Sequence, residues 1–295
     1  MNPTFLTIAR QGRNGWKRYL LGIVITYGIT ITIMVPLVLA SAYILGIPID
    51  NPNASDLMLN GNPIRSMVSG GLVSIALVLG LFLAVTRVHK RKFMTLVSPD
   101  ATINWLRVFK GFIVWLGLRG VSFSVWYLIS PSLFSLTFNL SEWLPFAFVA
   151  LIFVPIISLA ANIFILGYLL QGSGLLIRHP LLLPIVWGFV LGSLSNIGDS
   201  PEYWIRGVFY AVFLAWLVIK DNRLELALGL QTAEQLYSLI FISSPNPAIE
   251  GPTVFNIFDS ADLFLPALAT MALRAGLFYF IFFGRRKNLS TSIPD

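Results

Sequence analysis

Long uninterrupted apolar runs are the feature of this sequence that most constrains its fold. A run of about 18 or more apolar residues with few charges is a candidate for a helix that crosses the roughly 30 Å hydrocarbon core of a membrane. Such runs give eight predicted spans: Tyr19–Gly46, Met67–Val85, Val108–Leu128, Leu144–Leu170, Leu181–Ile197, Tyr203–Ile219, Leu224–Ser243 and Leu263–Phe283. The sequence therefore predicts an all-α fold, a polytopic membrane helix bundle of about eight transmembrane helices that forms a single domain over residues 1–295.

The composition excludes an ordinary soluble domain. Of the 295 residues, 56% are hydrophobic and 11% are charged, whereas a soluble domain carries about 25% charged residues. The first run is also far longer than the roughly 7 to 15 apolar residues of a signal peptide, which predicts a retained helix. Contact with membrane lipid is therefore expected along most of the chain.

The distribution of Lys and Arg predicts the orientation of the bundle. Sixteen of the 20 basic residues lie on the N-terminal side of the predicted map, and Arg65 and Arg206 lie on the opposite side. Excess positive charge marks the cytoplasmic side, so both termini are predicted to be cytoplasmic, in a bacterial inner membrane or an equivalent such as a thylakoid. Because these clusters account for the net charge of +7, no nucleic-acid partner is expected.

Two loop regions and two histidines carry weaker signals. The string Arg87, His89, Lys90, Arg91 and Lys92 is typical of a cytoplasmic flank, and it also suits anionic headgroups. His89 and His179 lie beside other basic residues, where solvated side chains are expected. The loops at 51–62 and 244–259 are rich in Asn, Pro and Ser, which predicts irregular surface connections.

A polar stripe interrupts the predicted span Leu224–Ser243. Gln231 and Gln235 are four residues apart and share one helix face, and Glu234 adjoins that face. Two interpretations stay open: a ligand or proton site, or a set of hydrogen bonds to neighbouring helices. Arg119 and Arg274 also fall inside spans, as counter-ions for Glu234, as anchors for a substrate carboxylate, or as structural side chains.

No metal site or cofactor is predicted from the residue types. The chain has no cysteine and two histidines, and it contains no HExxH motif. A protein zinc site needs three or four nitrogen, sulfur or carboxylate ligands. No group of residues in the sequence offers such a set.

Three strings between residues 87 and 237 resemble the CPBP family of intramembrane proteases, which includes the CAAX proteases, bacteriocin-processing enzymes and Abi proteins. The first is the basic string followed by FMTLVSPDATINWLRVFKGFIVW, and the second is PIISLAANIFILGYLLQGSGLLIRHP from Pro155 to Pro180. The third is IKDNRLELALGLQTAEQ from Ile219 to Gln235. The resemblance implies a helical membrane bundle built on the scaffold of a metalloprotease.

The family's catalytic positions carry different residues in this chain. The glutamate pair and the following arginine of the first motif match Ala161, Asn162 and Leu166. The Phe and His of the second motif match Leu191 and Ser195, with Asn196 as the alternative if the register slips. The His and Asn of the third motif match Gln231 and Gln235. Metal-assisted hydrolysis needs imidazole or carboxylate ligands and a general base, so no peptidase activity is predicted.

The resulting hypothesis is a catalytically inactive CPBP-like membrane protein, a pseudoenzyme that acts by binding. Its partner would be another integral membrane protein, complex or peptide, held in a cavity lined by Asn162, Ser195, Gln231, Glu234 and Gln235. One alternative is an active endopeptidase that processes prenylated or signal-type peptides. A second alternative is a transporter in which Glu234, Arg119 and Arg274 form an intramembrane charge relay.

Overall fold

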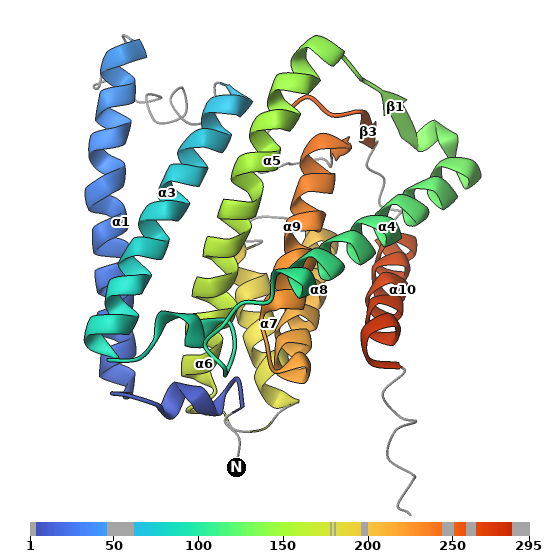
Figure 1. The fold of residues 1–295 in the computed structure, drawn as a ribbon. Coiled ribbons are helices and arrows are strands. Elements are labelled where there is room, and N and C mark those ends of the chain that lie inside the picture. Colours follow the sequence, from blue (N-terminus) through green and yellow to red (C-terminus); the bar gives the residue numbers. More distant parts are fainter. Residues whose placement is uncertain are drawn as a thin grey trace, which may run out of the picture.

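The computed structural model describes residues 4–45, 62–177, 179, 181–195, 200–243, 251–257 and 264–284. Within these ranges the chain forms eight long helices, which confirms the predicted all-α bundle (Figure 1). They are α1 (Trp16–Leu45), α3 (Pro63–Leu83), α4 (Trp105–Ile129), α5 (Leu140–Asn162), α7 (Leu182–Ser195), α8 (Pro201–Asp221), α9 (Glu225–Ile240) and α10 (Phe264–Phe283).

Short helical segments extend or connect these helices. Helix α5 continues through a π-helical segment, η5 (Ile163–Leu169), into α6 (Leu170–Ser173). Helix α3 continues in the same way into η2 (Ala84–Val88). The remaining segments are the 3-10 helices η1 (Thr7–Arg10), η3 (Phe93–Leu96) and η4 (Pro131–Leu133).

Six of the eight helices are long and apolar enough to cross a membrane: α1, α3, α4, α5 with its extension, α8 and α10. The other two are shorter than the roughly 20 residues that a span needs, since α7 has 14 residues and α9 has 16. Ten of the 16 residues of α9 are buried, because α9 lies among α4, α5 and α8. Its apolar run therefore packs against protein, and the prediction of eight full spans is supported for six.

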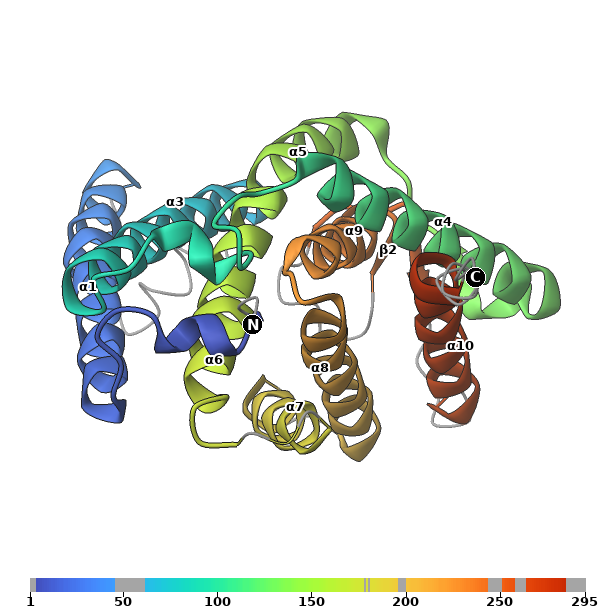
Figure 2. The ribbon, with the colours of Figure 1, turned by 60° about the horizontal axis from the view of Figure 1, so that its bottom comes forward.

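The helices follow one another across the bundle in an order that differs from the sequence. Helix α1 packs on α3, α3 on α5, α5 on α9, and α9 on α4. Helix α7 pairs with α8, which contacts α9, and α10 contacts α4 and α8 (Figure 2). Helix α9 thus lies inside the bundle and touches three of the other long helices.

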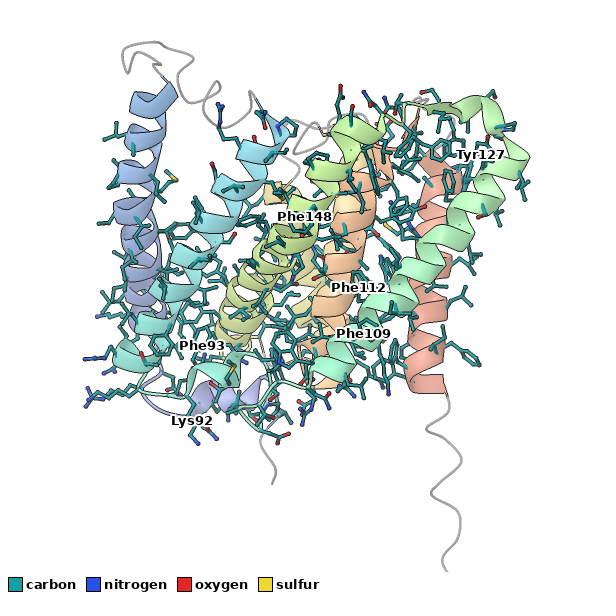
Figure 3. All side chains as sticks on the ribbon, turned by 45° about the horizontal axis from the view of Figure 1, so that its top comes forward. Lys92, Phe93, Phe109, Phe112, Tyr127 and Phe148 are labelled. Carbon is teal, nitrogen blue, oxygen red and sulfur yellow. The ribbon has the colours of Figure 1, made fainter. Side chains whose placement is uncertain are left out.

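Helix α1 begins and helix α10 ends at the same end of the bundle, which we call the basic end (Figure 1). It holds the start of α1, the end of α10 and Lys92, whereas Tyr127 lies at the opposite end (Figures 1 and 3). This arrangement agrees with the alternation of loops on which the predicted orientation rests. The assignment of the basic end to the cytoplasm stays a prediction.

The outer surfaces of the long helices are apolar, as lipid contact requires. Phe109 of α4 is 59% exposed and Phe148 of α5 is 65% exposed (Figure 3). Large apolar side chains exposed along a helix are stable in lipid, which solvates them as well as a protein core does. The helices therefore present a surface for membrane lipid.

Asparagine residues cap the N-termini of three of the helices. Asn62 precedes Pro63 and accepts hydrogen bonds from the amides of Ile64 at 2.9 Å and Arg65 at 3.2 Å. Asn104 and Asn139 cap α4 and α5 in the same way. Such caps satisfy amide groups that have no partner within the helix.

A small sheet lies at the opposite end of the bundle. Strand β3 (Phe255–Ile257) pairs antiparallel with β1 (Phe134–Leu136) and parallel with β2 (Ile242–Ser243). The prediction of an irregular connection over 244–259 is therefore wrong for β3. The strands are two or three residues long and come from distant parts of the chain, so no local pattern indicates them.

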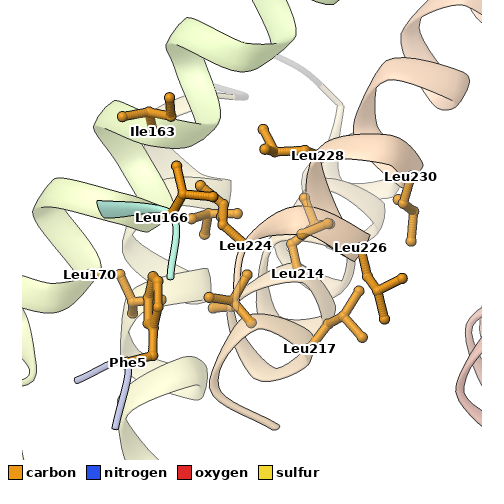
Figure 4. Close-up of a cluster of buried hydrophobic side chains, with 14 of the residues drawn as sticks. Phe5, Ile163, Leu166, Leu170, Leu214, Leu217, Leu224, Leu226, Leu228 and Leu230 are labelled. Carbon is orange, nitrogen blue, oxygen red and sulfur yellow. The ribbon is translucent and has the colours of Figure 1, made fainter. Parts of the chain in front are cut away.

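The main core is a cluster of buried apolar side chains to which the α5 extension, α8, α9 and the segment before α1 contribute (Figure 4). Leu166 and Leu170 of the α5 extension belong to this cluster together with Leu214 and Leu217 of α8. The segment before α1 closes this core, since Phe5 is 1% exposed and its amide donates to Asn222 Oδ1 at 2.5 Å.

Candidate functional site

A cavity of about 400 Å³ lies between four helices near the sheet. We call it the α4–α10 pocket, and its floor and walls come from the second halves of α4 and α9 and the first halves of α8 and α10. Its lining residues are Arg119, Ser122, Phe123, Trp126, Leu133, Phe134, Tyr203, Arg206, Gly207, Glu234, Tyr237, Ser238, Ile242, Ile257, Ala267, Thr270, Met271 and Arg274. Pockets of this size bury most of a small ligand.

Glu234 is the acidic residue among the lining side chains, and α4 supplies its partners. The indole Nε1 of Trp115 donates to Glu234 Oε2 at 2.7 Å. Arg119 Nε lies 3.4 Å from the same oxygen, and Arg119 Nη2 donates to Ser238 Oγ at 3.4 Å. The carboxylate is therefore held in one orientation by a hydrogen bond and an ion pair from the facing helix.

An aromatic ring lies beside each of the three arginines that line the pocket. The guanidinium of Arg119 lies 4.6 Å from the ring centroid of Tyr237, and that of Arg274 lies 5.6 Å from the ring centroid of Trp115. Such cation–π contacts lower the cost of burying the charge. Trp115 thus connects Arg274 and Glu234, and sequence reasoning missed it because a tryptophan within an apolar run carries no polar signal.

Two glycines allow α4 and α9 to approach closely enough for these contacts. A Cβ atom at Gly229 would overlap the Val108 carbonyl oxygen, and one at Gly111 would lie 2.7 Å from the Leu226 carbonyl oxygen. Small residues at a crossing let two helix backbones come together. Trp115 and Glu234 lie one to two turns beyond this crossing, so the crossing sets their separation.

The polar stripe of α9 splits between two neighbouring helices. Gln231 accepts a hydrogen bond from the Tyr210 hydroxyl of α8 at 2.9 Å, whereas Glu234 faces α4. Gln235 is half-buried. Of the residues predicted to line a cavity, Glu234 is among the lining residues of the α4–α10 pocket, whereas Asn162, Gln231 and Gln235 are not.

Asn162 lies at the end of α5, next to the π-helical segment η5. It is 4% exposed, and its side-chain Nδ2 donates to the Ser158 carbonyl oxygen at 2.7 Å. Ala161 is half-buried beside it, and Leu166 is 3% exposed in the main core. A π-helical turn is often found at functional sites, and here the turn carries apolar side chains into the core.

The remaining predicted positions lie on or after α7. Leu191 is half-buried, and Ser195 is the last residue of α7. The side chain of Ser195 and the whole of Asn196 lie outside the described residues.

A second polar cluster lies at the basic end, where α4, α8 and α9 meet. Arg107 Nη2 lies 2.6 Å from both carboxylate oxygens of Asp221. Glu225 is fully buried and pairs with Arg107 Nε at 3.3 Å and Arg223 Nη1 at 3.4 Å. It also accepts the Asn104 amide at 2.9 Å, and Arg223 pairs with Asp100. The DNRLE segment (residues 221–225) therefore connects α8 and α9 to α4 through ion pairs at this end of the bundle.

His89 is buried at the basic end, so the expectation of a solvated side chain is wrong for it. It is 1% exposed, with Nδ1 3.1 Å from the Arg13 carbonyl oxygen and Nε2 2.9 Å from the Tyr168 hydroxyl. Burial, together with the positive charge of Arg91, lowers the pKa of His89 to about 4. Its partners are 76 and 79 residues away in the sequence, which is why no local pattern revealed them.

The chemistry available in the α4–α10 pocket is that of recognition. Glu234 is paired with Arg119, which favours a fixed carboxylate over a general base. Within the described ranges, no three His, Cys, Asp or Glu residues are grouped so that they could hold a metal ion. The pocket instead combines guanidinium groups, hydroxyl groups and aromatic rings, which bind polar and apolar parts of a ligand side by side.

Comparison with known proteins finds sequence similarity to an uncharacterized protein. No family model matches the chain, and no solved structure matches it. The chain is similar to the uncharacterized protein YyaK of Bacillus subtilis (strain 168), at 28% identity over 258 residues. The match covers 84% of this chain and 85% of that protein, whose name states no activity. The similarity therefore extends over most of the chain.

Proposed function

We propose that this chain is a non-catalytic, CPBP-like membrane protein that binds a peptide or a segment of another membrane protein in the α4–α10 pocket. The observation that carries the proposal is the paired state of Glu234. Glu234, the acidic side chain among the described lining residues, is engaged by Trp115 at 2.7 Å and by Arg119 at 3.4 Å. A carboxylate held in this way orients a binding surface.

The residues at the family's catalytic positions support the same proposal. Ala161 and Leu166 carry no ligand atoms, and Asn162 donates to its own helix. Gln231 is engaged by Tyr210. Hydrolysis through a bound metal requires several charged or imidazole ligands together with a base, and these side chains supply neither. The retained bundle and the altered centre therefore favour binding without cleavage.

The proposal is tested by photo-crosslinking from the pocket in the native membrane. A benzophenone amino acid replaces Met271, which lines the pocket, and in a matched variant it replaces Leu273, which is 62% exposed on the same helix. We expect a discrete peptide or protein adduct from position 271 and lipid adducts from position 273. Mass spectrometry of the adducts distinguishes the two classes.

A second substitution connects the adduct to the pocket. Arg119→Gln removes the ion pair with Glu234 and is expected to reduce the adduct from position 271 several-fold. Identical adducts from positions 271 and 273, or lipid adducts alone from both, would contradict the proposed occupant.

A further inference from the structure

We infer that the α4–α10 pocket recognises a single carboxylate carried on an apolar chain, and that Arg274 is the residue that binds it. The inference rests on the proposed function, because it uses the same pocket, and it names the chemistry of the occupant. It is carried by a buried guanidinium whose Nε has no hydrogen-bond partner among the described residues, and by the apolar surface of the same pocket.

The three arginines of the lining differ in their acidic neighbours. Three arginines and one glutamate line the pocket. Arg119 is paired with Glu234 at 3.4 Å. Arg206 lies 4.3 Å from the ring centroid of Tyr203 and one helical turn after Glu202, which is a favourable spacing for an ion pair. The described lining therefore carries a net positive charge, and Arg274 forms no ion pair with the residues that the structure describes, although Glu234 attracts it from beyond ion-pair distance.

Arg274 is also buried without a hydrogen-bond acceptor. Its exposed fraction is 8%, and its Nε has no hydrogen-bond partner among the residues that the structure describes. A buried guanidinium donor without an acceptor costs free energy that an incoming anion would recover. The planar guanidinium suits a carboxylate, which accepts two parallel hydrogen bonds from it.

The rest of the lining suits an apolar chain beside that carboxylate. Phe123, Trp126 and Met271 contribute apolar surface, and the hydroxyl of Thr270 accepts from Trp126 Nε1 at 3.1 Å. With the tryptophan nitrogen satisfied, its ring is free to contact a hydrocarbon chain. The cavity of about 400 Å³ lies within the range of pockets that hold small ligands.

The charge of the pocket favours one negative charge over two. A dianion such as a phosphate monoester would place its second charge near Glu234, and like charges in a site with little water repel each other. A carboxylate pairs with Arg274 and leaves the pair of Arg119 and Glu234 intact. The sheet residues Phe134, Ile242 and Ile257 line the same pocket, so it belongs to the half of the bundle away from the basic end.

Decanoate and decanol provide a matched pair of probes, since they share an apolar chain and differ in the charge of the head. Equilibrium binding of radiolabelled probe to the purified full chain in mild detergent gives the two affinities. We expect decanoate to bind at least roughly tenfold more tightly than decanol, as a charge-assisted hydrogen bond predicts. Equal affinity of the two probes would overturn the inference, and this comparison needs no variant to fold.

Variants at Arg274 assign the effect to that residue. Arg274→Gln is expected to remove most of the preference for decanoate, and Arg274→Lys to retain part of it. Arg87→Gln removes the same charge from an exposed position at the basic end and is expected to leave decanoate affinity unchanged. Unchanged decanoate affinity in Arg274→Gln, or tighter binding of decyl phosphate than of decanoate to the unaltered protein, would also contradict the inference.

Failure of this inference and failure of the proposed function give different results. Decanoate binding that depends on Arg274, without a peptide adduct from position 271, would support the carboxylate site and reject the peptide occupant. A peptide adduct from position 271 without any preference for decanoate would support the proposed function and reject Arg274 as a carboxylate ligand.

Discussion

The two polar clusters of this bundle lie at opposite ends of α9 and differ in how completely their charges are satisfied. At the basic end, Glu225 is fully buried and has two arginine partners and a backbone amide. In the α4–α10 pocket, Glu234 has a side chain that is 25% exposed and one arginine partner at 3.4 Å. The pocket also contains Arg274, which forms no ion pair with the described residues. Its Nε lacks a hydrogen-bond partner among them, as does the Nε of Arg107 at the basic end, but Arg107 is paired with Asp221 and Glu225.

This difference separates a structural role from a binding role. A buried charge that is fully paired holds elements together, and removal of one partner leaves a costly isolated charge. An arginine beside a cavity without an acceptor is available to a ligand. The same helix therefore closes the bundle with its first turn and, under the proposed function, contributes Glu234 to the binding pocket with its second half.

The largest expected effect comes from a comparison of two matched substitutions on α9. Glu225→Gln leaves Arg107 and Arg223 short of a buried partner, so it is expected to lower the free energy of unfolding by about 3 to 5 kcal/mol. Glu234→Gln is expected to lower it by about 1 kcal/mol, because the Glu234 side chain is 25% exposed and forms one ion pair, at 3.4 Å. Thermal unfolding in mild detergent measures both, and equal losses would remove the distinction between the two clusters.

A smaller effect is expected at the crossing of α4 and α9, which connects the two clusters. Gly229→Leu forces the backbones apart, and overpacking of this kind costs about 1 to 3 kcal/mol. It also separates Trp115 and Arg119 from Glu234, so decanoate binding should weaken together with stability. Gly117→Leu, where a Cβ has open space around it, is the control, and an equal loss in that variant would show that the crossing has no special role.

His89 at the basic end is expected to make the stability of the fold depend on pH. Its pKa is lowered from the usual 6.5 to about 4, so the folded protein favours the neutral imidazole. Stability is then complete above pH 6.5 and is lost as the pH falls toward 4. The expected loss between pH 7 and pH 5 is on the order of 2 kcal/mol. His89→Gln should flatten this dependence in unfolding measurements, and an unchanged pH profile in that variant would exclude His89 as its source.

The sequence predicted the helices well because a long apolar run has few alternatives to a buried or lipid-exposed helix. It overestimated α9 as a span, since hydropathy does not distinguish a helix buried in protein from one in lipid. Isolated charges within apolar runs indicated Glu234, Arg119 and Arg274 as site residues. One role predicted for Arg119 was that of a counter-ion for Glu234, and the structure contains this ion pair. Ionisable side chains in membrane helices almost always face the interior of the bundle and pair with one another, which makes such ion pairs predictable.

The features that sequence reasoning missed all depend on contacts between distant residues. Trp115 reaches Glu234 because α4 crosses α9 close to both residues. His89 is buried against Arg13 and Tyr168, which lie far from it in the sequence. Strand β3 forms because β1 and β2 flank it. Local composition records none of these pairings, and the α4–α10 pocket itself arises from four helices whose order in space differs from their order in the chain.

The central claim, binding without cleavage, is tested most directly by metal analysis of the purified full chain combined with a peptide cleavage assay after incubation with zinc. The account predicts no stoichiometric zinc and no turnover of hydrophobic or prenylated peptides, because the matched catalytic positions lack ligands and a base. One zinc ion per chain together with turnover that a chelator abolishes would contradict it.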